Sequence, residues 1–151
     1  MFTREIKFKK TLFFVLLSFI YLGCNKTLRI VPCDSLKEKN KLVYLNDSLY
    51  TGICEIYKDT ILIASRHYKE GQRDGKWEEY YENGTIKDIG GYSKNELSGK
   101  YSKYYPDGKV AIKGNFKEGF KDDKWIYFSK TNDTLYIEFY SDRRLITKKN
   151  Y

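Results

Sequence analysis

The sequence predicts an all-β protein, an array of antiparallel β-hairpins that forms an elongated, twisted sheet of a single layer. Three observations predict this class. The 151-residue chain contains 15 Tyr and 9 Phe, which suit pleated, half-buried surfaces, whereas alanine, the best helix former, occurs only at two positions. Short runs that alternate between apolar and polar residues lie between turns that contain glycine. A phrase of 23–24 residues recurs along the chain from Gly52 onward.

The N-terminal segment, residues 1–23, has the pattern of an export signal. Residues 1–11 carry four Lys and Arg, and residues 12–22 form an apolar run, "LFFVLLSFIYL". A run of this length is typical of a signal peptide and is too short to span a bilayer, which takes about 20 residues. It ends in Leu22-Gly23-Cys24, which resembles the lipobox of bacterial lipoproteins, with Tyr21 where that pattern usually has leucine. The resemblance implies cleavage before Cys24 and acylation of its thiol and new amine. An ordinary cleaved signal and a buried N-terminal helix are the alternatives.

Residues 24–41 are predicted to be the lipidated Cys24 followed by a tether, and residues 42–151 the repeat domain. The tether is polar, contains Pro32 and has no clear periodicity. Cys33 and Cys54 remain after lipidation, and an even pair in an exported protein favours a disulfide. Such a bridge would join the tether to the first strand, and closing a loop of this size stabilises the fold by about 3 kcal/mol. Two free, half-buried thiols are the alternative.

Each repeated unit contains a Gly-Lys-aromatic start, a Tyr-Tyr pair and an Asn-Gly or Asp-Gly turn. The start occurs at Gly75–Trp77 and Gly99–Tyr101, and Asp123–Trp125 is a variant of it. The outer copies are degenerate, as expected for the ends of a repeat array. An earlier copy begins at Gly52, and the last copy has Thr131–Asp133 in place of the glycine turn.

One unit has the local pattern of a β-hairpin. Residues 109–116 alternate between apolar and polar side chains, as in a half-buried strand. The pairs at 83–84 and 107–108 are expected to form type I′ turns, in which both central residues have positive φ. Second turns, such as 69–75 and 117–123, are expected to join one hairpin to the next.

These units resemble MORN repeats, and in particular the bacterial variant that is often labelled as a YwqK-like antitoxin component. That variant has the phrase Gly-x-Trp-x-x-Tyr-Tyr-x-Asn-Gly, then a strand, then Tyr-x-x-Gly-x-x-x-Gly. The resemblance covers residues 50–140 and implies a β-hairpin array with a binding or scaffolding role. The antitoxin label is not carried over, because an antitoxin usually acts in the cytoplasm and this chain has an export signal. The matching positions are Gly75, Trp77, Tyr80, Tyr81, Asn83, Gly84, Tyr92 and Gly99, and then Gly99, Tyr101, Tyr104, Tyr105, Asp107, Gly108, Phe116 and Gly119.

No convergent catalytic, metal or cofactor site is predicted. His67 is the single histidine, whereas a triad needs a base and a zinc site needs several ligands. Glu78 and Glu79 are adjacent, so they point to opposite faces of a strand. The glycines lack the Gly-Lys-Ser/Thr ending of a phosphate-binding loop. Polar strand residues such as Lys87 and Asp88 are expected to be exposed.

The recurring aromatic residues are the remaining feature with functional content. They are expected either to pack as the core of a single-layer sheet or to form a face that binds a protein, peptide or glycan. The candidate binding face comprises Trp77, Tyr80, Tyr81, Tyr101, Tyr104, Tyr105 and Trp125.

These observations predict a non-catalytic binding or scaffold module, anchored to the membrane of the bacterial cell envelope by its N-terminal lipid and facing the periplasm. The alternative is an immunity or antitoxin-like protein that neutralises a toxin in the envelope. An unidentified protein is the expected partner. Without residues 1–23 the net charge is +5 (24 Lys and Arg against 19 Asp and Glu), which is spread along the chain and, with export, argues against nucleic acid.

Overall fold

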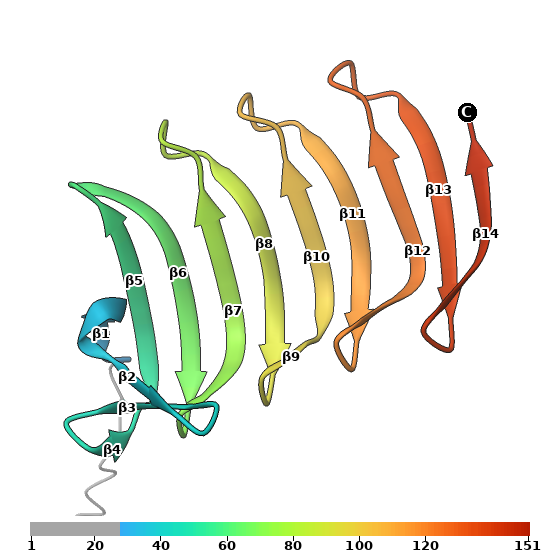
Figure 1. Cartoon of the computed structure of the whole chain (residues 1–151). Helices are drawn as coiled ribbons and strands as arrows, with labels where there is room; N and C mark the ends of the chain where they lie inside the picture. Colours follow the sequence, from blue (N-terminus) through green and yellow to red (C-terminus); the bar gives the residue numbers. More distant parts are fainter. Residues whose placement is uncertain (1–27) are drawn as a thin grey trace, which may run out of the picture.

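The computed structural model describes residues 28–151, so the predicted signal peptide and Cys24 lie outside the described residues. An 11-stranded sheet forms a largely antiparallel meander in which neighbouring strands follow chain order (Figure 1). This confirms the predicted all-β hairpin array. Within residues 28–151, no helix is long and apolar enough to cross a membrane.

Four hairpins and a final strand make up the repeat array, which begins at Gly52. The short strand β9 (Glu96–Leu97) pairs only with β8, within the connection that leads to the third hairpin. The other strands are β5 (Gly52–Lys58), β6 (Ile61–Lys69), β7 (Gln72–Tyr80), β8 (Ile86–Ser93), β10 (Gly99–Tyr104), β11 (Val110–Lys117), β12 (Phe120–Phe128), β13 (Thr134–Ser141) and β14 (Arg144–Asn150).

The described part of the predicted tether, residues 28–41, differs from a free linker. Strand β1 (Ile30–Pro32) pairs in parallel with β5, and a 3₁₀ turn, η1 (Cys33–Ser35), follows it. The chain then forms a separate three-stranded sheet from β2 (Lys37–Lys39), β3 (Leu42–Leu45) and β4 (Ser48–Leu49). The physical reason is the open edge of β5, whose backbone groups need partners. Polar composition alone did not reveal this pairing.

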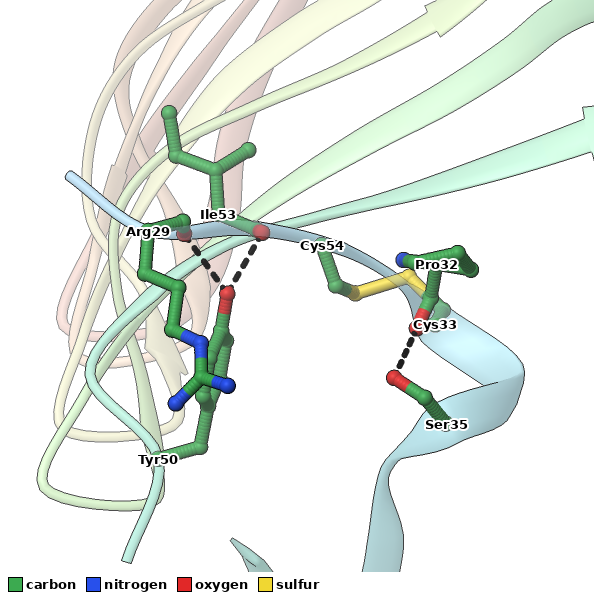
Figure 2. The surroundings of a disulfide bond; sticks show 7 residues. All are labelled: Arg29, Pro32, Cys33, Ser35, Tyr50, Ile53 and Cys54. Carbon is green, nitrogen blue, oxygen red and sulfur yellow. Dashed lines mark hydrogen bonds between the residues drawn. A yellow bond between two sulfur atoms is a disulfide. The ribbon is translucent and has the colours of Figure 1, made fainter. Parts of the chain in front are cut away.

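A disulfide joins Cys33 to Cys54 at this end of the array (Figure 2). Cys54 is 1% exposed and belongs to the hydrophobic core, together with Val43, Tyr50 and Tyr68. The Tyr50 hydroxyl lies within hydrogen-bond distance of two carbonyls that border the β1–β5 junction, those of Arg29 (2.8 Å) and Ile53 (2.6 Å). Covalent and polar links therefore hold β1 against the first hairpin.

The prediction of type I′ turns at 83–84 and 107–108 is wrong, and turns of that type lie elsewhere. In the loops at 81–85 and 105–109, only Gly84 (φ 81°) and Gly108 (φ 83°) have positive φ, and each glycine N–H donates to the carbonyl three residues earlier. This is a type I turn followed by a left-handed glycine, one of the longer hairpin loops. Both central residues have positive φ instead in the connections between hairpins, at 70–71, 94–95, 118–119 and 142–143, as type I′ turns require.

A β-bulge occurs once in every hairpin. The register shifts between Glu79 and Tyr80, and again between Lys103 and Tyr104. The extra residue always lies on the second strand of the hairpin and at the same place in each unit, at Ile63, Lys87, Ala111 and Leu135. Bulges bend strands and increase their twist, which is consistent with the bowed strands in Figure 1.

The turn glycines yield a first prediction. Gly84→Val and Gly108→Val should each lower the free energy of unfolding by about 1–2 kcal/mol, because a branched side chain disfavours the left-handed conformation. An added Cβ would meet no atom within 4 Å at either position, so the loss comes from the backbone. Thermal or urea unfolding measures it, and Lys87→Ala, with an exposed ion pair to Glu79 at 3.6 Å, is the control with a change within about 0.5 kcal/mol. Equal losses for glycine and lysine variants would contradict the role given to the turns.

Candidate functional site

Three rings from alternate strands stack along one face of the sheet, and we call Trp77, Tyr101 and Trp125 the aromatic row. The centroids of Trp77 and Tyr101 are 6.2 Å apart, and those of Tyr101 and Trp125 are 5.4 Å apart, both in stacked orientation. Strands two positions apart are separated by about 9.5 Å. The rings therefore lean toward each other across the strand between them.

Glycine on the intervening strand makes this contact possible. Gly90 is the cross-strand neighbour of Trp77, and an added Cβ there would lie 2.8 Å from the Trp77 indole nitrogen. Gly114 is the neighbour of Tyr101, and an added Cβ there would collide with the Trp125 ring. Trp77 and Trp125 thus both lean toward the central Tyr101.

At the C-terminal end of the aromatic row, Trp125 contacts a lysine that forms an ion pair with a glutamate. The Lys121 Nζ lies 4.6 Å from the centroid of the Trp125 ring and 3.3 Å from a carboxylate oxygen of Glu138. The hydroxyls of Tyr127 and Tyr140 donate to the same oxygen at 2.8 and 3.0 Å. Although burial opposes its charge, hydrogen bonds with the two tyrosines hold the pKa of Lys121 above its ordinary value. Burial raises the pKa of Tyr127 to about 12, with Lys121 acting against the shift and Glu138 with it.

The N-terminal end of the row opens into a hollow of about 120 Å³. The Arg73 guanidinium lies over the Tyr92 ring, 5.4 Å from its centroid. The same pocket is lined by Arg66, His67, Arg73, Trp77, Glu79 and Tyr92, and we call it the N-terminal hollow.

The arginines of the N-terminal hollow lack a carboxylate partner of the kind that Lys121 has at the other end, and the Arg73 guanidinium donates to the Tyr92 hydroxyl at 3.4 Å. Neither Arg66 nor Arg73 forms an ion pair with a described residue. Within residues 28–151, the Trp77 indole nitrogen is the one buried side-chain nitrogen or oxygen without a hydrogen-bond partner, and it lies over Gly90. Burial, with Lys76 adding to it, lowers the pKa of His67, so this imidazole stays neutral to a lower pH than usual.

Asp88 lies on the face of the aromatic row and contacts Tyr101. It is buried, with 5% of the residue exposed, so the prediction that it faces solvent is wrong. The Tyr101 hydroxyl donates to it at 2.5 Å, and the Lys103 Nζ is 4.0 Å away. Burial and the hydrogen bond to Asp88 hold the pKa of Tyr101 well above its usual range. The structural reason is the cross-strand pairing of Asp88 with Glu79 and Lys103, which places it on the face of the aromatic row.

The candidate binding residues do not form one face. Tyr81 and Tyr105 donate their hydroxyls at 2.8 Å to the carbonyls of Tyr104 and Phe128, and so link the second hairpin to the third and the third to the fourth. Tyr80 and Tyr104 alternate with residues of the row's face and point to the opposite side of the sheet. Trp77, Tyr101 and Trp125 are brought together, although Trp125 is only 2% exposed.

The sequence interpretation missed the charged residues at the two ends of the row. The signal was present in the repeat, because Arg73 and Lys121 occupy the same position in units that are two repeats apart. The same offset relates Gly90 to Glu138. Among residues 28–151, no group of three or more His, Cys, Asp or Glu is arranged to hold a metal ion.

Comparison with known protein families gives a match to the centre of the array. Residues 73–95 and 97–118 each match the family model described as MORN repeat variant. No curated protein matches the chain. A chain in the "Crystal structure of accessory secretory protein 1,2 and 3 in Streptococcus pneumoniae" is similar at 13% identity and a TM-score of 0.35, over 76% of this chain and 20% of that one. A likeness at this TM-score supports no inference. The protein therefore contains two adjacent segments that match the MORN repeat variant, within a hairpin array that extends beyond them on both sides.

The buried carboxylate yields a second prediction. Asp88→Ala should lower the free energy of unfolding by about 1–3 kcal/mol, because it leaves the buried Tyr101 hydroxyl without its acceptor. The double variant Asp88→Ala with Tyr101→Phe should recover part of this loss, since both partners are then removed. Urea unfolding of the single and double variants measures the coupling. Strictly additive losses would show that the hydrogen bond is not formed.

Proposed function

We propose that this chain is a non-catalytic binding module that is anchored to the envelope membrane through a lipid on Cys24 and binds a protein partner with the face of the aromatic row. The observation that carries the proposal is the N-terminal hollow, where a tryptophan, a tyrosine and two arginines surround an open space. These residue types dominate the binding energy of protein interfaces. The two matched MORN repeat variant segments support a repeat module of this kind.

The position of the anchor supports a site close to the membrane. The chain from Cys24 to Ile30, where β1 begins, can extend at most about 22 Å, at about 3.6 Å for each residue. Strand β1 pairs with β5, and the N-terminal hollow lies on the next strands, β6 to β8. A partner bound there would therefore reside in, or reach down to, the same membrane surface.

The third prediction tests the anchor. Cys24→Ala should abolish labelling by a radioactive fatty acid and move the protein from the membrane to the soluble fraction, because one hydrophobic attachment is lost. Cys33→Ser is the control, since it removes a different cysteine and should leave labelling unchanged. Retention of the Cys24→Ala protein on membranes after a high-salt wash would contradict lipid anchoring.

The fourth prediction tests the face. Trp77→Ala should abolish capture of the partner from envelope extracts, whereas Tyr104→Ala, on the opposite side of the sheet, should keep it. Circular dichroism and melting curves of both variants identify any loss that comes from unfolding. Equal capture by Trp77→Ala and wild type would exclude this face, and a single stoichiometric toxin among the captured proteins would favour an immunity role over a scaffold.

A further inference from the structure

We propose that the N-terminal hollow binds a carboxylate group of the partner protein, either an Asp or Glu side chain or the carboxylate at a chain terminus. The inference rests on the proposed binding function, because it names the chemical group that the partner contributes. It follows from comparing the two ends of the aromatic row, where the same repeat positions carry different charged residues.

Each end of the row has a cation at the same place in the repeat. Lys121 lies over Trp125 and contacts Tyr140, whereas Arg73, two repeats earlier, lies over Tyr92 and lines the hollow with Trp77. At the C-terminal end the Glu138 carboxylate neutralises the cation and accepts three donors. A glycine, Gly90, stands at the position equivalent to Glu138. Arg73 therefore has no carboxylate at that repeat position, where the Trp77 indole lies over Gly90 instead.

The hollow also carries a second cation that the C-terminal end lacks. Arg66 is the cross-strand neighbour of Trp77 and lines the hollow from β6. The one carboxylate in the lining, Glu79, forms its ion pair with Lys87 instead, at 3.6 Å. Because Trp77 leans away over Gly90 toward Tyr101, space remains on the Arg66 side of the indole. Two guanidinium groups thus line an open space with no paired anion among residues 28–151.

The size and charge of the hollow favour a carboxylate over a phosphate. About 120 Å³ accommodates a carboxylate with one or two carbon atoms, and guanidinium groups bind carboxylates with two parallel hydrogen bonds. Glu79 in the wall would repel a phosphate dianion more strongly than a single negative charge. The ring faces of Trp77 and Tyr92 offer apolar contact to the carbon atoms of the bound group.

The fifth prediction uses the two indole N–H signals as reporters. In ¹⁵N-labelled full chain kept in mild detergent, titration with sodium acetate should shift the Trp77 indole signal saturably. Trp125 should not shift, because its indole donates to the Asn115 carbonyl at 3.1 Å, away from the hollow. Sodium chloride at equal ionic strength should shift neither signal. A Trp125→Phe variant assigns the two signals.

Matched variants identify the binding groups. Arg73→Leu and Arg66→Leu should each weaken acetate binding at least tenfold, and Arg73→Lys should weaken it less, because the charge remains but the paired hydrogen bonds are lost. Arg144→Leu, an exposed arginine on β14, removes the same charge and should leave binding unchanged. A dispersed spectrum for each variant shows that it is folded. Equal effects of chloride and acetate, or an equal loss in Arg144→Leu, would overturn the proposal.

Further titrations separate the sources of the group. The peptides acetyl-Gly-Gly-Ala with a free and with an amidated C-terminus test a terminal carboxylate, and acetyl-Gly-Glu-Gly-amide tests a side chain. Stronger saturable binding of inorganic phosphate than of acetate would overturn the choice of carboxylate. Failure here is distinguishable from failure of the proposed function: partner capture that persists in Arg73→Leu rejects only the carboxylate, whereas acetate binding without a captured partner rejects only the partner protein.

Discussion

The constraint on which this structure depends is that, beyond the N-terminal core around Cys54, a sheet of one layer has nothing to pack against except itself. Side chains on alternate strands are too far apart to touch unless they lean across the strand between them. Glycine at Gly90 and Gly114 allows this, and the resulting stack of Trp77, Tyr101 and Trp125 replaces the second layer of an ordinary domain. Tyrosine hydroxyls between hairpins and buried Asp88 add polar links along the same direction.

The stack of three rings has two ends. At each end the last ring must contact something other than another ring of the stack. At the C-terminal end a glutamate replaces the repeated glycine and pairs with Lys121. In the first hairpin, Cys54 stands where the later hairpins have Trp77 and Tyr101, and it forms the disulfide to Cys33 instead of contributing a ring. The N-terminal hollow, which is lined by Arg66 and Arg73, presents two cations that form no ion pair within residues 28–151.

Much of the fold could be predicted from the sequence because the repeat makes each local signal occur several times. Alternation, turn glycines and the recurring tyrosines indicated a hairpin array, which the structure confirms. The turn type at 83–84 and 107–108 was predicted wrongly, because Asn-Gly is compatible with both a type I′ turn and a type I turn with a left-handed glycine. Burial of Asp88 and pairing of β1 depend on which strands lie side by side. The N-terminal hollow was harder still, since it depends on how the Trp77 ring leans over Gly90 and on where Arg66 and Arg73 lie around it.

Because of the disulfide, the two ends of the array differ in how readily they unfold locally. Strand β1 and the first hairpin are covalently joined, so the N-terminal end cannot fray without the core around Cys54 opening. Every residue of β14 is exposed, and the strand has a neighbour on one side only. In a chain whose units contact only adjacent units, opening proceeds from the weaker end. Backbone amides should therefore exchange with solvent in a graded order, fastest at β14 and slowest near β5, so that the array loosens in one direction.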